Sequence, residues 1–277
     1  MTAKAPDLLV FDAASPQPVR RAVADLADGV RQWRLAWRLA VLDLRNRYRG
    51  SVIGPLWLTV SHAVAVVGLG LLYPVLMGVE AARYVPHLAA GFLVWALLQP
   101  GLAEGCQTFI AAESIIRQMR LPYSVHVLRV VFRTLLVSAH AAPVLVVVLV
   151  AYGVLPGAAI LLLPLGLALV AVTLAAAALF LGMLCARFRD VAQIVGTVTH
   201  FAFFFTPILW QAEQLGPWQT FLLLNPFYPL LECVRAPLLG AVPALTVWAA
   251  AVSYAALAAG LAFALFASLR RRIAFWV

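Results

Sequence analysis

The chain has 277 residues, of which 64% are hydrophobic and only 11% are charged, and its mean hydropathy is +0.97. This composition leaves too little polar surface to cover a soluble globule of this size, so it predicts an integral membrane protein. The net charge of +9 does not indicate nucleic acid as a partner, because the arginines adjoin apolar stretches rather than forming a soluble basic domain. The cysteines at 106, 185 and 233 stand apart without metal-ligand spacing, so no metal site is expected.

The first fifty residues precede any apolar stretch. Residues 1–18 contain three prolines and predict a flexible cytoplasmic tail. Across residues 19–50 the periodicity becomes helical, with Trp33 and Trp37 on one stripe and Arg34 and Arg38 on a neighbouring one. This pattern predicts an amphipathic helix in the membrane interface, and the alternative is an ordinary positively charged flank of the first span.

Residues 51–277 are expected to form an all-α transmembrane domain with six membrane-spanning helices, because six apolar stretches have about the 20 residues that a helix needs to cross a bilayer. The predicted spans cover about 55–78, 86–106, 126–152, 156–185, 192–210 and 244–268. Cytoplasmic loops retain Lys and Arg, and an inside N-terminus puts all of the 20 basic residues except Arg83 and Arg235 on the cytoplasmic side. Both termini are therefore expected in the cytoplasm.

Two further segments are too short to span. Glu113 to Pro122 is both charged and apolar, and it predicts a short cytoplasmic helix that docks onto another surface, with a simple interfacial turn as the alternative. Between spans five and six, the apolar pieces at 217–224 and 229–239 are interrupted by prolines. They predict two short re-entrant helices on the outer side.

Polar and aromatic side chains inside the spans suggest the lining of a substrate path. Charged groups in a span usually face a bundle interior or a wet cavity, although arginines near a helix end can also snorkel to the headgroups. The aromatic residues at the end of the fifth span have an interfacial belt as their default explanation. The candidate lining residues are Arg129, Arg133, His140, Phe201, Phe204, Phe205 and Trp210.

No catalytic motif is present in a credible context: the chain has no phosphate-binding loop, no HExxH zinc motif and no Ser/His/Asp constellation. No catalytic residue is therefore expected. If the protein moves a substrate uphill, the energy has to come from a partner or an ion gradient.

Several stretches together resemble a known family. They are Arg47-Tyr-Arg-Gly-Ser-Val-Ile-Gly-Pro-Leu-Trp57, Phe109-Ile-x-x-Glu113-x-Ile-Ile-Arg117 with Leu121-Pro122, Thr206-Pro-Ile-Leu-Trp210, Leu224-Asn-Pro-Phe-Tyr-Pro-Leu-Leu-Glu-Cys-Val-Arg235 and Arg270-Arg-Arg-Ile-Ala-Phe-Trp276. From about residue 30 to the end, the chain resembles the permease subunit of ABC-2-type polysaccharide exporters, the group that exports O-antigen, teichoic acid and polyol phosphate.

The resemblance implies an assembly and a substrate. It implies a homodimer in the bacterial inner membrane that binds two cytoplasmic ATP-binding subunits, with ATP and Mg on those partners and no cofactor in this chain. The substrate would be a polysaccharide linked to a polyprenyl diphosphate lipid.

The resemblance also implies roles for residues of this chain. The entrance for the lipid diphosphate would consist of Arg47, Tyr48, Arg49, Gly50, Ser51 and Trp57. The coupling helix for the ATPase would include Glu113, Ile116, Arg117, Gln118, Arg120 and Pro122. The re-entrant outer region would include Asn225, Pro226, Phe227, Tyr228 and Arg235.

Two other functions remain open at this point. One is an ABC-2 exporter of a drug or a small lipid. The other is a membrane enzyme acting on polyprenyl phosphates, which the same arginines with His126 and His140 would suit. The enzyme is the less expected of the two, because the spans contain only Glu104 as a buried acid for metal or base chemistry.

Overall fold

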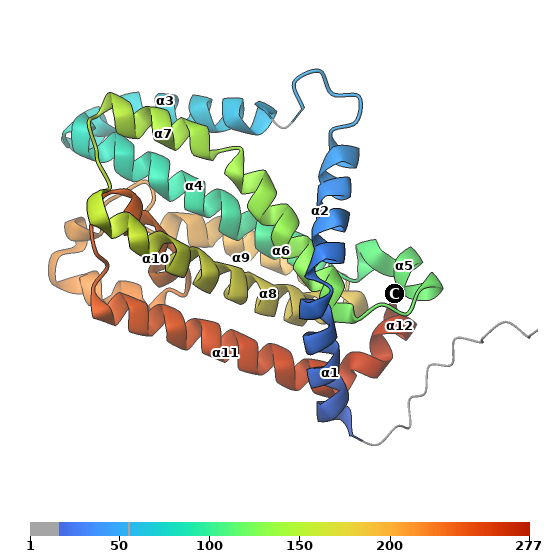
Figure 1. Cartoon of the computed structure of the whole chain (residues 1–277). Helices are drawn as coiled ribbons and strands as arrows, with labels where there is room; N and C mark the ends of the chain where they lie inside the picture. Colours follow the sequence, from blue (N-terminus) through green and yellow to red (C-terminus); the bar gives the residue numbers. More distant parts are fainter. Residues whose placement is uncertain (1–16, 55) are drawn as a thin grey trace, which may run out of the picture.

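The computed structural model describes residues 17–54 and 56–277, so most of the predicted N-terminal tail and Pro55 lie outside the described residues. All regular structure in the described part is helical (Figure 1). Long helices run side by side in one bundle, and the first two helices lie across one end of it (Figure 1). The prediction of an all-α protein is confirmed.

Within the described residues, five helical segments are long and apolar enough to cross a membrane. They are α3 (Leu56–Met77), α4 (Ala81–Cys106), α6 (Tyr123–Ala139) continued by α7 (Ala142–Ala151), η2 (Gly157–Leu162) continued by α8 (Leu163–Arg187), and α11 (Leu245–Leu269). Helix α4 is the most buried of them and contacts α3, α6, α7, α8 and α9. The bundle is therefore built around α4, and α3 is largely exposed at its side.

The predicted fifth span forms a shorter helix than expected. Helix α9 (Val191–Phe205) ends five residues before Trp210, because Thr206 is extended and Pro207 follows it. Its 15 residues give a length of about 22 Å, less than the roughly 30 Å of a bilayer core. Five span-length helices are thus observed in the described part, and the sixth span stays a prediction.

The segment predicted as an interfacial helix forms two helices, α1 (Pro18–Arg31) and α2 (Trp33–Arg47), with a turn at Gln32 between them. Small residues let the pair approach the bundle closely. A side chain added at Gly29 would lie 2.0 Å from Ser124 Oγ of α6, so only glycine fits there. Trp33 and Trp37 are 49% and 40% exposed. These exposed rings beside arginines on a helix across the bundle end suit a position in the membrane interface.

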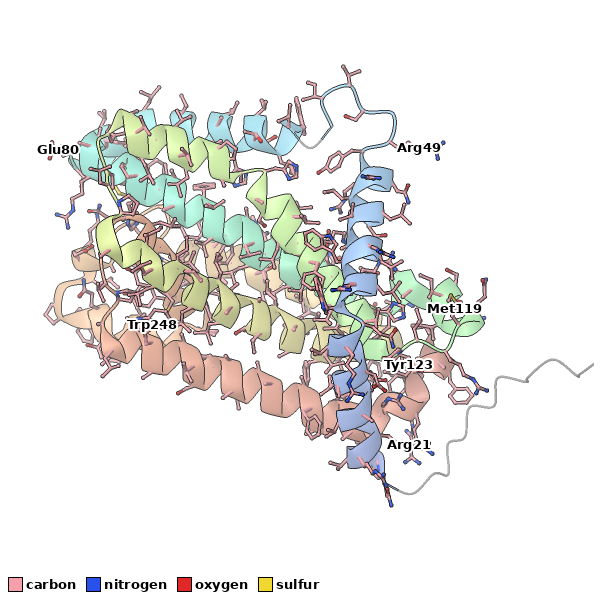
Figure 2. The ribbon with its side chains drawn as sticks, in the orientation of Figure 1. Arg21, Arg49, Glu80, Met119, Tyr123 and Trp248 are labelled. Carbon is pink, nitrogen blue, oxygen red and sulfur yellow. The ribbon has the colours of Figure 1, made fainter. Side chains whose placement is uncertain are left out.

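The remaining short elements lie beyond the spans. Helix α5 (Glu113–Gln118), preceded by η1 (Ile110–Ala112), and helix α12 (Ile273–Trp276), preceded by η4 (Arg270–Arg272), lie at the same end as α1 and α2 (Figure 1). Between α9 and α11 the chain forms η3 (Ala212–Leu224), which is kinked at Gly216, and α10 (Phe227–Leu238). Figure 2 shows Arg49 and Met119 at the α1–α2 end, and Glu80 at the opposite end.

Candidate functional site

Five charged side chains from three helices meet where α2 crosses the bundle. Asp43 on α2 accepts hydrogen bonds from Nε and Nη2 of Arg129 at 2.6 and 2.5 Å, and from Nη1 of Arg133 at 3.0 Å. Glu104 on α4 accepts from Nε of Arg133 at 2.7 Å and from Nη1 of Arg47 at 2.9 Å. We call this set the charge cluster; its members are Arg47, Asp43, Arg129, Arg133 and Glu104.

Helical spacing explains how the charge cluster forms. Asp43 and Arg47 are four residues apart on α2, and Arg129 and Arg133 are four apart on α6, so each pair lies on one face of its helix. Helices α2 and α6 pack against each other, which brings the two faces together. Glu104 completes the cluster from the end of α4, close to the same surface.

The charge cluster is shielded from water at one side and open at the other. The side chains of Asp43, Glu104, Arg129 and Arg133 are only 15–16% exposed, whereas that of Arg47 is 50% exposed. Buried charges are tolerated when they are paired and hydrogen-bonded, as they are here. With three arginines and two carboxylates, the cluster carries one excess positive charge, and Arg47 presents it to the surroundings.

The structure therefore places Arg129 and Arg133 against carboxylates of neighbouring helices. From the sequence, these two arginines were predicted either to line a substrate path or to reach the lipid headgroups. Neither alternative included Asp43 or Glu104 as a partner. In this conformation the positive charge of both is already neutralised.

Within the described residues, neither His126 on α6 nor His140 directly after it forms a hydrogen bond with the charge cluster. Nδ1 of His140 is 2.7 Å from the carbonyl oxygen of Leu136, and the His140 carbonyl accepts a hydrogen bond from the Thr59 hydroxyl of α3. His140 thus joins helices at the break between α6 and α7. His126 is 1% exposed, and neither ring nitrogen has a hydrogen-bond partner among the described residues.

The residues of the predicted entrance lie at the end of α2, in the turn that follows it and in the first turn of α3. Helix α2 ends at Arg47, and Gly50 adopts a φ of 83°, a conformation that glycine tolerates best. The Ser51 hydroxyl accepts a hydrogen bond from the backbone N–H of Gly54 at 3.0 Å. Trp57, in the first turn of α3, is 59% exposed. Arg49 is exposed and Tyr48 half-buried, so most of this turn faces the surroundings.

The predicted coupling helix is shorter than expected and is anchored to the end of the chain. Helix α5 carries a Glu113–Arg117 ion pair at 2.9 Å, and Arg117 also donates to the carbonyl oxygen of Val277 at 2.7 Å. Ile116 is only 5% exposed and packs in the protein's own core. Met119, by contrast, is 55% exposed. Gln118, Met119 and Arg120 are exposed, as are Ser114 and Arg117 on α5, and Pro122 is half-buried ahead of α6.

A second buried carboxylate ties the same end together. Asp25 on α1 accepts hydrogen bonds from the backbone N–H groups of Tyr123 and Ser124 at 3.2 and 3.0 Å, so it caps the start of α6, where the helix dipole favours negative charge. Arg270 donates to Asp25 from Nε and Nη2 at 2.9 and 2.7 Å. One residue thereby connects α1, α6 and the C-terminal segment.

At the other end of the bundle, the aromatic residues of α9 divide between two environments. Phe203 packs inward against Phe92 and Trp95. Phe201, Phe204 and Phe205 are 52–71% exposed, so they form an apolar face on the outside of the described chain. Trp210 lies beyond this face, and its indole N–H donates to the carbonyl oxygen of Phe204 at 3.0 Å.

Asn225 fixes the passage from η3 into α10. Its side-chain nitrogen donates to the Thr206 hydroxyl at 3.0 Å, and its side-chain oxygen accepts from the backbone N–H of Phe227 at 2.9 Å. Pro226 is exposed and Tyr228 half-buried. Arg235 is only 3% exposed. The predicted re-entrant residues thus surround the start and the buried face of α10.

The sequence interpretation missed Asp25, Asp43 and the role of Glu104 as an ion-pair partner. A signal for Asp43 was present, because it precedes Arg47 by four residues on a helix. Nothing in the sequence connects Asp25 to Arg270, which is 245 positions away.

Five span-length apolar helices in the described residues, with the α1–α2 pair across one end and a buried charge cluster at that junction, define a multi-pass membrane protein. The family model described as "ABC-2 type transporter" matches residues 34–239, and the chain belongs to this family.

The chain is also similar to three curated proteins that share one name. The chain is 25% identical over 197 residues to the O-antigen export system permease protein RfbA of Myxococcus xanthus, covering 70% of this chain and 76% of the relative. Two proteins of the same name from Klebsiella pneumoniae are 27% and 26% identical over 178 residues, covering 62% of this chain and 67% of each relative.

Proposed function

We propose that this chain is the permease subunit of an ATP-driven exporter that moves a polyprenyl-diphosphate-linked, O-antigen-like polysaccharide out of the cytoplasm of a bacterium. The ABC-2 family match and the names of the relatives support the transport class and the substrate class. The proposal places α1, α2 and both termini at the cytoplasmic face of the inner membrane, with α9 as the sixth span and η3 and α10 re-entering from the outer side.

The observation that carries the substrate proposal is the half-exposed Arg47, which holds the excess charge of the charge cluster beside an exposed Arg49. Guanidinium groups pair with phosphate oxygens through two parallel hydrogen bonds, and this pairing is stronger near a low-dielectric surface. Because Arg47 already donates to Glu104, an arriving diphosphate competes with that carboxylate for the guanidinium.

The charge cluster then has a second role in this proposal. Asp43 and Glu104 attach the interfacial helix to α6 and α4. A shift of Arg47 toward the substrate would weaken its contact with Glu104 and so alter the ion pairs that hold α4 and α6. Asp25 and Arg117 attach α1 and α5 to the C-terminal segment close by. Substrate arrival and the ATPase contact on α5 would thus act on one connected end of the bundle.

The assembly proposed is a homodimer with two ATP-binding subunits. Exporters of the ABC-2 family normally work with an ATP-binding partner. The exposed face of α9 and the exposed flank of α3 are apolar enough to meet a second copy or lipid. Met119 and its exposed neighbours are the surface offered to each ATP-binding subunit, which supplies the ATP and Mg chemistry.

Deletion and co-purification test the proposed function. Removing the chromosomal copy should abolish a surface polysaccharide, and the tagged chain should retain an ATP-binding subunit through purification. A strain that keeps its surface polysaccharide would refute the substrate class. ATPase stimulation by hydrophobic small molecules instead of lipid-linked glycans would favour a drug or lipid exporter.

A further inference from the structure

A pocket of about 510 Å³ opens at the end of the bundle opposite the charge cluster. Its walls come from five separate parts of the chain: the first turns of α4, the loop after α7 at Val154, the segment around η3, helix α10, and the loop leading into α11. The volume lies within the range of small-molecule sites. The charged and polar side chains that line it include Arg83, His87, Gln211, Glu213, Tyr228, Glu232 and Arg235.

Charge in this outer pocket is balanced. Arg235 donates to the Glu232 carboxylate from Nε and Nη2 at 3.1 and 2.5 Å, and to the Pro207 carbonyl. At the rim, Nη2 of Arg83 lies 3.8 Å from Oε1 of Glu213. Each arginine therefore has its own carboxylate. A pocket with no surplus charge favours a neutral ligand over an anion or a cation.

Two polar groups in the outer pocket have hydrogen-bonding capacity to spare. Gln211 is 8% exposed, and among the described residues its side-chain amide has no hydrogen-bond partner. Its amide atoms stay accessible to solvent, and they offer both a donor and an acceptor to a ligand. The Tyr228 hydroxyl likewise has no partner within the described part of the chain. Burial, with a further contribution from Glu232, raises the pKa of Tyr228 to about 12, so this hydroxyl remains protonated and able to donate.

The fixed groups around them complete a polar lining. Glu232 keeps 21% of its side chain exposed, so its carboxylate can accept from a ligand while it holds Arg235. Nε2 of His87 lies 3.1 Å from both the Trp210 carbonyl oxygen and Nη1 of Arg235, so it either donates to the first or accepts from the second, according to its tautomer. Carboxylate, amide and phenol groups that converge on a neutral cavity match the alternating donors and acceptors of vicinal hydroxyl groups.

We propose that the outer pocket binds a neutral sugar unit, with Gln211, Tyr228 and Glu232 as its hydrogen-bonding contacts. This proposal rests on the proposed function, in which the sugar belongs to the exported polysaccharide at its exit. The pocket would hold one unit of the chain while the next emerges, and so oppose backward sliding.

Binding can be measured on the permease in lipid nanodiscs together with its co-purified ATP-binding subunit. The probes are neutral trisaccharides of mannose, galactose and rhamnose, with trigalacturonate as an acidic probe of equal length. Saturation-transfer NMR and calorimetry should detect saturable binding of at least one neutral trisaccharide and weaker binding of the acidic one. Gln211→Leu and Tyr228→Phe should each raise the Kd of the neutral trisaccharide that binds by about tenfold. This is the effect of one lost hydrogen bond in a buried site.

Gln214→Leu is the matched control, because Gln214 is exposed in the same segment and does not line the pocket. Its Kd should stay within about twofold of the unmodified chain. Absence of saturable binding to all neutral probes, tighter binding of trigalacturonate, or equal losses in Gln211→Leu and Gln214→Leu would each overturn the proposal. Surface polysaccharide in the deletion strain is scored separately, so a failed sugar site is distinguished from a wrong proposed function.

Discussion

Asp43 on helix α2 accepts two hydrogen bonds from the guanidinium of Arg129 on helix α6, at 2.6 and 2.5 Å. Both side chains are about 15% exposed, and Arg133 shares the same carboxylate. Helix α2 is therefore attached to the bundle by ionic contacts as well as by packing.

Replacing the shared carboxylate should loosen this attachment. Asp43→Asn leaves two arginines without full charge compensation at a shielded site, and breaking a buried pair costs about 3 kcal/mol. We expect a clearly lower unfolding temperature in detergent. Asp28→Asn is the control, because its pair with Arg31 is 3.5 Å long and exposed, so its effect should stay below about 1 kcal/mol. Equal losses in both variants would contradict a structural role for Asp43.

Removing the positive charge at the proposed entrance should reduce export without unfolding the protein. Arg47→Ala combined with Arg49→Ala removes two half-exposed or exposed guanidinium groups. We expect surface polysaccharide to fall about tenfold or more at normal expression, since each lost charge-assisted contact contributes about 1.5 kcal/mol or more. Arg31→Ala, with an 80% exposed side chain on α1, should export normally. Normal export by the double variant would contradict a role in substrate binding and leave these arginines with a role in membrane orientation only.

Two apolar residues near α5 should behave in opposite ways. Ile116→Ala creates a cavity in the core and should lower the free energy of unfolding by about 2–4 kcal/mol. Met119→Ala removes an exposed side chain (Figure 2), so stability should be retained while association with the ATP-binding subunit weakens. Thermal unfolding and co-purification measure the two effects. If Met119→Ala leaves co-purification intact, the proposed ATPase surface lies elsewhere.

A close helix contact at Gly166 provides a test of the packing between α8 and α10. A Cβ at this position would lie 2.3 Å from the carbonyl oxygen of Cys233, and backbone on both sides limits relief. Gly166→Ala should therefore lower the unfolding temperature, with overpacking costs of about 1–3 kcal/mol. Gly260→Ala on α11 meets no atom within 4 Å and should not destabilise.

The proposed orientation can be read from cysteine labelling. Gln219→Cys in η3 and Arg189→Cys after α8 place thiols at exposed positions, while the native cysteines are 0–1% exposed and should remain unlabelled. In intact cells whose outer membrane is permeabilised, an impermeant maleimide should modify Gln219→Cys and spare Arg189→Cys until the inner membrane is opened. The reverse pattern would invert the topology. Labelling of both positions would show that α9 does not cross the membrane.

The sequence by itself determined the membrane class, the helical fold and the approximate position of each long helix. These properties depend on apolar length and charge along the chain, which are local and additive. Helical structure ahead of α3 was also predicted, because Trp33 and Trp37 repeat with helical spacing beside arginines. The length of α9 was overestimated, because the apolar stretch in the sequence extends past Thr206 and Pro207 whereas the helix ends at Phe205.

Only the tertiary structure decided what the charged residues do. Arg129 and Arg133 pair with Asp43 and Glu104, which are between 29 and 90 positions away along the chain, and Ile116 turns into the core instead of outward. Periodicity shows which residues share a face of one helix. Which two faces meet depends on packing among helices far apart in sequence, and the ion pairs follow from that packing.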